Sequence, residues 1–330
     1  MEKIAILVVP EQLEKNFGKE EIEKLKNYGE VKVWNGNENF KEFLKGATII
    51  ITSWDSPEIT SSIFSFAPDI KFIMHSAGSI KSIVEREVME KGVRVSSCSN
   101  VLGKFVAITA LGYILTSVKK IFWWNDFIKN TGKWRENEKL MEYTDEIVGP
   151  DIGIISLSNV GKNLLRFLRI FGEQIYVYDP YWSEERIKNL GGKKVNTLLE
   201  IAEKCEIIAL CAPLTEETKG MIGKDFFQKM KDGSVFINTA RGAIIDENAL
   251  IEELKKERIF ACLDVTCNEP LDKTSPLRKL KNVVISPHIA GLVKNGLKEL
   301  GKFSVEEVVR FIRGEKLENE IIYEKLDITA

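Results

Sequence analysis

The chain has 330 residues, which exceeds the usual size of one domain and predicts two domains. Its 47 basic and 49 acidic residues leave a net charge of −2 with no long block of one sign, so we expect no nucleic-acid or membrane partner. Five cysteines without a C-x-x-C pair and only two histidines argue against a disulfide framework and against a metal site.

The N-terminal region contains short apolar runs that predict strands. These runs are KIAILVV (3–9), ATIIITSW (47–54), IKFIMHSAG (70–78) and GVRVSSCS (92–99). Continuous runs rich in Ile and Val are typical of parallel strands that are covered on both faces, so we expect a sheet made of βα units. The first residues turn polar too early for a signal peptide, and no apolar run approaches the ~20 residues of a membrane span, which predicts a cytoplasmic protein.

An amphipathic segment at 103–124 is long enough to be a helix that carries the chain into a second domain. A second series of apolar runs then follows: DIGIISLS (151–158), QIYVYDP (174–180), EIIALCAPL (206–214), GSVFINTARG (233–242), IFACLDVT (259–266) and NVVISPHIAG (282–291). The last helical segment, at 301–316, is expected to return and pack on the first domain. The fold class is therefore α/β, with two doubly wound parallel-sheet domains.

The stretch DIGIISLSNVGKNLL (151–165) has the order of a dinucleotide-binding turn, in which a strand, a short loop and a helix follow each other. Ser156 and Ser158 replace the first two glycines of the G-x-G-x-x-G fingerprint, and Gly161 keeps the third, which allows close packing of helix on strand. Each serine costs about 1–2 kcal/mol where a positive φ is needed. A serine hydroxyl at a helix N-terminus can itself donate to a phosphate, so we expect loosened rather than abolished binding.

Asp179 follows the next apolar strand, where a carboxylate accepts hydrogen bonds from the adenosine ribose and repels a 2′-phosphate. This position favours NAD over NADP. On this fingerprint alone, an ordinary βαβ unit with a serine N-cap and a surface aspartate remains an alternative.

Three later segments place functional side chains just after predicted strands, where doubly wound folds gather their ligands. Arg241 offers a planar guanidinium that can bind a substrate carboxylate in bidentate fashion. His288 can give or take a proton near neutral pH, and Glu269 would favour its imidazolium form and fix its tautomer. A surface ion pair for Arg241 and a structural histidine are the alternatives, but the three side chains together favour catalysis.

Five segments in order resemble the D-isomer-specific 2-hydroxyacid dehydrogenase family, which includes glyoxylate/hydroxypyruvate reductases and phosphoglycerate dehydrogenases. They are the glycine turn with its FG and YDPY continuation, APLTEETKGMIG, NTARGAIIDE, LDVTCNEPL and SPHIAG, and the N-terminal HSAGSIKSIV resembles a branch of the same family. The resemblance covers nearly the whole chain. It implies two Rossmann-like domains, with an NAD-binding domain (104–292) inserted into a substrate domain (1–103 and 293–330), and a homodimer held through the cofactor domain.

The family's functional residues carry over to matching positions of this chain. The resemblance implies that Arg241 binds a 2-oxo acid, that His288 is the acid/base for a hydride transfer with NADH, and that Glu269 supports His288. The implied substrate-binding amides are those of Ala77, Gly78 and Ser79. The implied cofactor residues are Ser158, Asn159, Val160, Gly161, Asp179, Ala212, Pro213, Thr239, Ala240, Asp264 and Gly291.

Other functions remain open from the sequence. The family also includes transcriptional corepressors, so a non-catalytic NAD(H)-responsive binding protein is the alternative to an NAD-dependent dehydrogenase, and the serine turn is its best support. A dehydrogenase that prefers NADP is a further alternative, against which Asp179 argues. Near HSAGSIK, Lys81 is the only evident basic residue for a substrate phosphate, so we expect a small unphosphorylated 2-oxo acid.

Overall fold

The protein divides into two compact units. A computed structural model describes residues 1–146, 149–171, 174–291, 294 and 296–328. Unit 1 comprises Met1–Leu102 and Leu292–Ala330, and unit 2 comprises Gly103–Gly291. The chain passes from one unit to the other twice, and each boundary lies one residue before the boundary expected from the sequence. The substrate and cofactor roles assigned to these parts are not decided by the division itself.

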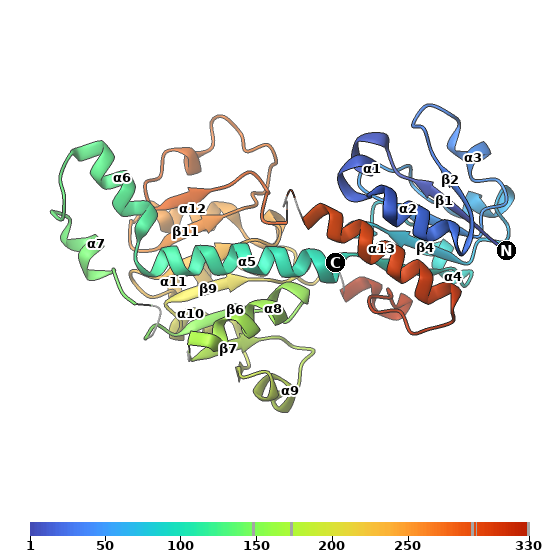
Figure 1. Ribbon diagram of the computed structural model, residues 1–330. Coiled ribbons are helices and arrows are strands. Elements are labelled where there is room, and N and C mark those ends of the chain that lie inside the picture. Colours follow the sequence, from blue (N-terminus) through green and yellow to red (C-terminus); the bar gives the residue numbers. More distant parts are fainter. Residues whose placement is uncertain (147–148, 172–173, 292–293, 295, 329–330) are drawn as a thin grey trace. The chain divides into compact units, whose positions relative to one another are not determined.

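Unit 1 is built on a parallel sheet of five strands in the order β2-β1-β3-β4-β5. The strands are β1 (Glu2–Leu7), β2 (Gly29–Val33), β3 (Ile49–Thr52), β4 (Phe72–His75) and β5 (Arg94–Ser97). Helices α1 (Pro10–Asn16), α2 (Lys19–Lys26) and α13 (Gly296–Ile312) pack on one face of this sheet, and α3 (Phe40–Phe43) and α4 (Arg86–Glu90) contribute to the core on the other (Figure 1). The last long helix therefore returns to unit 1, as expected.

Unit 2 is built on a parallel sheet of seven strands in the order β12-β11-β10-β9-β6-β7-β8. The strands are β6 (Ile152–Ile155), β7 (Ile175–Tyr178), β8 (Lys193–Val195), β9 (Ile207–Leu210), β10 (Val235–Asn238), β11 (Phe260–Leu263) and β12 (Val283–Ile285). A hydrophobic core covers each of its two faces. Ile154 packs in one core, and the next residue, Ile155, packs in the other. This burial on both faces explains why the strands are continuous apolar runs. The expected doubly wound α/β fold is confirmed for both units.

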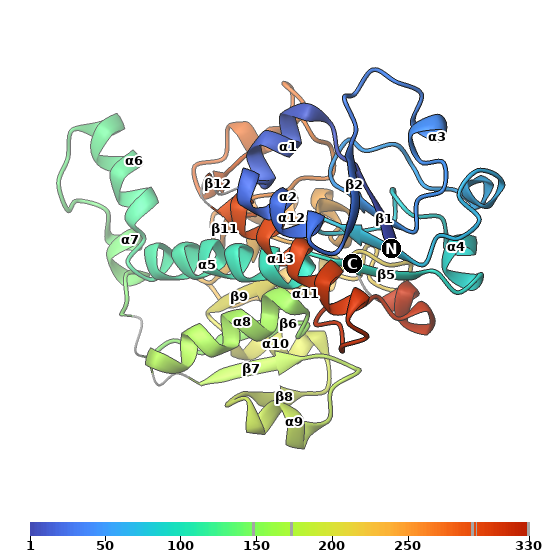
Figure 2. The ribbon, with the colours of Figure 1, turned by 45° about the vertical axis from the view of Figure 1, so that its right-hand side comes forward.

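Helices line both faces of the unit 2 sheet (Figures 1 and 2). One core includes residues of α5 (Ser99–Val118), α6 (Ile121–Thr131), α7 (Glu138–Glu142) and α8 (Asn159–Leu168), together with Ile187 of α9 (Glu184–Asn189). The opposite core includes residues of α10 (Leu198–Lys204), α11 (Lys224–Lys229) and α12 (Glu247–Leu254). Short 3₁₀ turns lie at Ser61–Ser65, Arg169–Phe171, Gly242–Ile244, Pro276–Arg278 and Tyr323–Ile328.

Two edge strands were not predicted from the sequence. β2 alternates polar and apolar residues in GEVKV and is mostly exposed, and β8 is the three-residue run KKV. Both lie at the edge of their sheet, where one side of the strand has no neighbouring strand to bury it. Lysines on an edge strand also discourage pairing with other chains. A pattern of continuous apolar residues therefore misses them.

The segment expected to be one helix at 103–124 forms parts of two helices, α5 and α6. The break falls at Lys120, which has a left-handed backbone (φ 51°) and donates from Nζ to the carbonyl of Ser117 at 3.3 Å. Contrary to the sequence-based expectation, α5 has 20 residues with a mean hydropathy of 1.7, enough to cross a membrane by length and composition. Most of its buried residues pack in a core of unit 2. A cytoplasmic location stays a prediction.

Candidate functional site

The predicted cofactor and catalytic residues of unit 2 lie at one edge of its sheet. All seven strands are parallel, so their carboxyl ends meet at the same edge. The strand order changes direction between β6 and β9, and ligands of doubly wound sheets bind at such switch points. The residues that follow these strands are Ser158, Asn159, Val160, Gly161, Asp179, Ala212, Pro213, Thr239, Ala240, Arg241, Asp264, Glu269, His288 and Gly291.

His288 and Glu269 form a direct pair. The Nδ1 atom of His288 lies 2.6 Å from Oε2 of Glu269, and both side chains remain partly exposed. A carboxylate at Nδ1 fixes the tautomer and the orientation of the ring. Nε2 is then the ring nitrogen that can exchange a proton with a substrate.

Asp264 holds the loop that carries His288. Its side chain is buried, and its carboxylate accepts hydrogen bonds from the backbone N–H of Ile289 at 3.0 Å and of Ala290 at 2.8 Å. The backbone N–H of His288 donates to the carbonyl of Asp264 at 2.8 Å. The expected contact of Asp264 with the cofactor stays a prediction, and within the chain its carboxylate oxygens position the histidine loop.

Sequence reasoning missed two residues that extend this network. The hydroxyl of Ser286 donates to Asp264, and the hydroxyl of Tyr113 on α5 lies 2.5 Å from the Ser286 oxygen. Burial raises the pKa of Tyr113, so this hydroxyl keeps its proton near neutral pH. The only sequence signal was a tyrosine in the long helix α5.

Arg241 follows β10 in a turn that is fixed on both sides. Asn238, the last residue of β10, accepts from the N–H of Ala240 at 2.9 Å and donates to the carbonyl of Arg241 at 3.2 Å. A Cβ on Gly242 would lie 2.1 Å from backbone atoms of Thr266, so only glycine allows this turn to press against the loop that leads to Glu269. The three proposed catalytic residues are thus brought together by backbone packing.

The guanidinium of Arg241 interacts electrostatically with Glu269. Protein atoms around the guanidinium lower the pKa of Arg241 even though part of the residue reaches solvent, and Glu269 opposes this shift. An arginine remains protonated in either case. The site therefore combines a fixed cation with a histidine–carboxylate pair, which suits binding of an anionic substrate and transfer of a proton to it.

The dinucleotide turn contains one strained serine and one capping serine. Ser156 has a positive φ of 76°, the conformation for which the fingerprint usually supplies glycine. Ser158 is the N-cap of α8, and its hydroxyl accepts from the N–H groups of Val160 and Gly161. A Cβ on Gly161 would lie 2.0 Å from the carbonyl oxygen of Ser156, so this glycine keeps its expected role in close packing.

Asp179 lies at the carboxyl end of β7, as expected for a ribose-binding carboxylate, but it is 4% exposed. Its Oδ2 accepts from the N–H of Leu157 at 2.7 Å and from the hydroxyl of Ser156 at 3.3 Å, and its Oδ1 accepts from the N–H of Tyr181 at 2.9 Å. Because each carboxylate oxygen has two lone pairs, Oδ1 retains capacity for a ribose hydroxyl. The tight glycine contact and this carboxylate together fit a dinucleotide.

The predicted substrate-binding residues lie in unit 1. Ala77, Gly78 and Ser79 follow β4, and the carbonyl of Ala77 accepts from the N–H of Cys98 at 2.8 Å. They therefore occupy the carboxyl edge of the other sheet. Among the described residues, no group of three or more His, Cys, Asp or Glu side chains is placed to hold a metal ion.

The chain belongs to the D-isomer specific 2-hydroxyacid dehydrogenases. Residues 111–290 match the NAD binding domain of this family, and NAD is the cofactor of that domain. The chain is 30% identical over 304 residues to D-3-phosphoglycerate dehydrogenase of Methanocaldococcus jannaschii, a match that covers 91% of this chain and 57% of that relative. It is 31% identical to human glyoxylate reductase/hydroxypyruvate reductase, with 77% of each chain covered.

Solved structures agree with this fold. The apo form of D-mandelate dehydrogenase from Rhodotorula graminis superimposes with a TM-score of 0.83, and 97% of each chain is covered at 23% identity. At that identity the likeness establishes the fold alone. The chain spans just over half the length of two D-3-phosphoglycerate dehydrogenases that it matches, so their activity is not transferred to it.

Proposed function

We propose that the protein is an NAD-dependent oxidoreductase that reduces a small 2-oxo acid to the D-2-hydroxy acid and catalyses the reverse reaction. The observation that carries this proposal is the His288–Glu269 pair, with Arg241 nearby, at the strand ends of an NAD-binding domain. Relatives named glyoxylate reductase and hydroxypyruvate reductase support a 2-oxo acid as substrate.

His288 is the proposed acid and base. As the ketone is reduced, negative charge develops on its oxygen, and Nε2 of protonated His288 donates the proton that neutralises it. In the oxidation direction, neutral His288 accepts the proton of the substrate hydroxyl. The carboxylate of Glu269 holds Nδ1, so the ring presents Nε2 and not Nδ1 to the substrate. The bound nicotinamide cofactor supplies or accepts the hydride.

Arg241 is the proposed substrate clamp. A guanidinium binds a carboxylate through two parallel hydrogen bonds, which fixes the orientation of the oxo group as well as its distance. The fixed turn between Asn238 and Gly242 limits the movement of the Arg241 backbone. The amides of Ala77, Gly78 and Ser79 are proposed as further ligands of the substrate carboxylate.

Replacement of His288 tests this proposal. In His288→Ala, we expect kcat for reduction of a 2-oxo acid to fall by a factor of about 10²–10⁴, because the proton donor is lost. The Kd for NADH, measured by calorimetry, should stay within about twofold of wild type, since His288 acts on the substrate. Turnover by His288→Ala at the wild-type rate would rule out the assigned acid.

The rival proposal is a non-catalytic NAD(H)-responsive binding protein. The strained and capped serine turn favours it, whereas a pure binding protein does not need a histidine–carboxylate pair as a proton relay. The two are separated by NADH oxidation on a panel of glyoxylate, hydroxypyruvate, phosphohydroxypyruvate and larger 2-oxo acids. NADH binding without turnover of any of them would favour the rival.

The same panel tests the proposed substrate class. The segment HSAGSIK carries Lys81 as its only lysine or arginine, so we propose that the substrate is unphosphorylated. We expect a higher kcat/KM for glyoxylate or hydroxypyruvate than for phosphohydroxypyruvate. The reverse order would contradict this part of the proposal.

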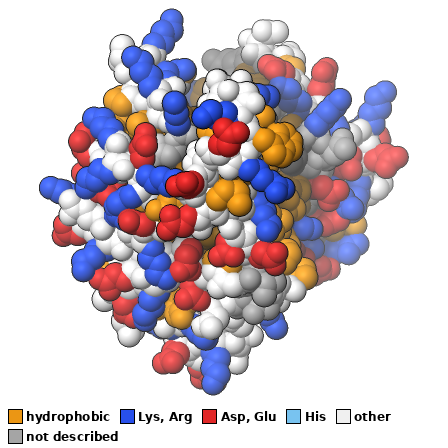
Figure 3. Space-filling model, turned by 90° about the vertical axis from the view of Figure 1, so that its left-hand side faces the viewer, with side chains coloured by type: hydrophobic (Ala, Val, Ile, Leu, Met, Phe, Trp, Pro, Cys, Tyr) orange, Lys and Arg blue, Asp and Glu red, His pale blue; other side chains and the backbone are white. Residues whose placement is uncertain are grey.

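We also propose a homodimer formed through unit 2. Large apolar side chains are exposed on α6, on α7 and on the loop between them, namely Ile121, Met141 and Trp134, the last of which is 69% exposed. In Figure 3, hydrophobic side chains lie among interspersed basic and acidic ones on the side that bears these helices. A contiguous exposed apolar surface marks a site that binds another protein, and we propose that these three side chains belong to such a surface.

Light scattering after size-exclusion chromatography measures the oligomeric state. We expect wild type to elute as a dimer and Ile121→Asp/Trp134→Asp to elute as a monomer, because two buried charges oppose association. Ile170→Asp, also in unit 2 and 81% exposed, is the matched control and should remain a dimer. A monomeric wild type would refute the dimer.

A further inference from the structure

Ser158 uses its hydroxyl to cap the helix that begins the dinucleotide site. The oxygen accepts from the N–H of Val160 at 3.2 Å and from that of Gly161 at 3.4 Å. These are among the first N–H groups of α8, which have no partner within the helix and in a glycine turn remain available to a phosphate. We propose that Ser158 limits the affinity of this protein for NAD(H), because its hydroxyl competes with the pyrophosphate for the start of α8.

The hydroxyl of Ser158 is not available as a phosphate donor in this arrangement. Its single proton is donated to the carbonyl oxygen of Cys211 at 2.6 Å, just after β9. The same oxygen accepts the hydrogen bonds from the N–H groups of Val160 and Gly161. A pyrophosphate therefore gains a hydrogen bond from Ser158 only if the bond to Cys211 breaks, and gains the helix N–H groups only if the cap is displaced.

The start of α8 packs closely against the turn before it and against α5. Gly161 lies so close to the turn that a Cβ there would be 2.0 Å from the carbonyl oxygen of Ser156. Gly103 of α5 is also close to this helix, although less so, since a Cβ on it would be 2.8 Å from the Cβ of Asn159. With the start of α8 held on two sides, the side chain of Ser158 also occupies the place that the second glycine of the fingerprint leaves open for the pyrophosphate.

The competition concerns the pyrophosphate alone. Adenosine has a ribose that can reach Asp179 but no phosphate, whereas ADP-ribose carries the complete pyrophosphate. Removal of the Ser158 side chain should therefore strengthen binding of ADP-ribose and NADH and leave adenosine unchanged. This inference rests on the proposed cofactor use of the site, but not on catalysis.

Calorimetry on the full chain tests the inference with ADP-ribose, NADH and adenosine as ligands. In Ser158→Gly, we expect the Kd for ADP-ribose to fall about three- to thirtyfold, the range that corresponds to the loss of a competing N-cap. Glycine is itself a tolerated N-cap, so the variant should fold, and circular dichroism checks this. Ser158→Ala removes the hydroxyl but keeps Cβ, and should give a smaller gain.

Thr197→Gly is the matched control. Thr197 caps α10 in the same unit, with its hydroxyl accepting from the N–H of Glu200 at 3.2 Å, and it takes no part in the proposed site. We expect this change to leave the Kd for ADP-ribose as in wild type.

The outcomes separate the inference from the proposed function. If wild type binds ADP-ribose and Ser158→Gly binds it equally or more weakly, the serine is neutral or a phosphate donor and the inference is wrong. An equal gain for adenosine would also contradict it, since the effect would not concern the pyrophosphate. If neither wild type nor Ser158→Gly binds ADP-ribose or NADH, the cofactor use of the site fails and the inference fails with it.

Discussion

Two residues of the candidate site have a backbone conformation that is unfavourable for a side chain. Ser156 has a φ of 76° and His288 a φ of 53°. The N–H of His288 donates to the carbonyls of Asp264 and Ser286, at 2.8 and 3.1 Å, and the N–H of Ser156 donates to that of Tyr178 at 2.8 Å. Such strain persists only where the surroundings impose it, and it is common at functional sites.

The strain at Ser156 can be measured by comparison of two variants. Ser156→Ala and Ser156→Gly both lose the hydrogen bond to Asp179, but only glycine relieves the positive φ. After allowance for the greater flexibility of unfolded glycine, we expect Ser156→Gly to be more stable than Ser156→Ala by about 1 kcal/mol. Urea unfolding of both variants gives this difference directly. Equal stability would mean that the turn carries no strain.

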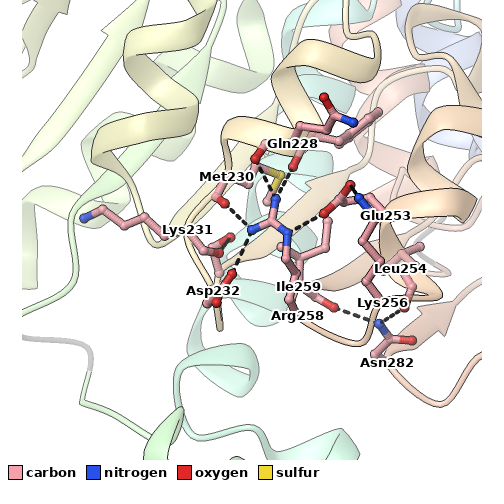
Figure 4. Close-up of polar contacts among 12 residues, drawn as sticks. Gln228, Met230, Lys231, Asp232, Glu253, Leu254, Lys256, Arg258, Ile259 and Asn282 are labelled. Carbon is pink, nitrogen blue, oxygen red and sulfur yellow. Dashed lines mark hydrogen bonds and ion pairs between the residues drawn. The ribbon is translucent and has the colours of Figure 1, made fainter.

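At the scale of the elements, the two edges of the unit 2 sheet serve different purposes. The carboxyl edge carries the candidate site, whereas the amino edge is held by Arg258, which precedes β11 (Figure 4). The guanidinium pairs with Glu253 and with Asp232, the latter at 2.9 Å, and donates to the backbone carbonyls of Phe227, Gln228 and Met230. All its donors are used within the fold, so we assign Arg258 a structural role.

Removal of Arg258 should therefore destabilise the fold without altering the site. In Arg258→Met, the buried carboxylate of Glu253 loses one of its two cationic partners and keeps Lys256, and we expect the free energy of unfolding to fall by about 2–3 kcal/mol. The Kd for NADH should be unchanged. Lys229→Met, which breaks an exposed pair with Glu203, is the control and should cost about 0.5 kcal/mol or less. A similar loss in both variants would refute the assignment.

At the scale of the whole molecule, each unit has its own sheet and its own cores, so acid need not affect them equally. His75 lies fully buried at the end of β4 in unit 1, with Nδ1 3.0 Å from the hydroxyl of Thr52. Burial lowers the pKa of His75 from 6.5 to about 4. The unfolded chain therefore binds a proton at a higher pH than the folded chain.

This difference predicts acid sensitivity of unit 1. The stability that neutral His75 contributes is complete above pH about 6.5 and is lost as the pH falls toward 4, by about 2 kcal/mol between pH 6.5 and 5. Hydrogen exchange at these two pH values should reveal the loss in unit 1, after correction for the intrinsic exchange rate. In His75→Gln the pH dependence of unit 1 should become smaller, and an unchanged dependence would exclude His75 as its source.

Most of the fold was accessible from the sequence because buried parallel strands leave a local pattern. Runs such as ATIIITSW and EIIALCAPL became strands because both faces of each sheet are covered. The edge strands β2 and β8 left no such pattern, and the backbone break at Lys120 depends on a side chain buried by distant residues. A local apolar pattern thus indicates a buried strand. The position of an edge strand or of a helix break depends instead on the residues that pack beside it in the fold.

The residues of the candidate site also fall into those that the sequence predicts and those that it does not. Arg241, Glu269 and His288 were found because each follows a strand and has a chemistry of its own. The contribution of Tyr113 and Ser286 was missed, because one hydroxyl on a helix and another after a strand form no recognisable sequence motif. The role of Asp264 in holding the histidine loop was equally hidden.

By itself, the sequence determined the two doubly wound sheets, the family and the strand ends at which polar side chains gather, because these depend on residue type and local order. Only the tertiary structure decided what each polar group does with its hydrogen bonds. Ser158 contacts Cys211, and Asp264 contacts the loop after β12, across long stretches of chain. Whether a serine binds a phosphate or caps a helix depends on such partners, and local sequence does not specify them.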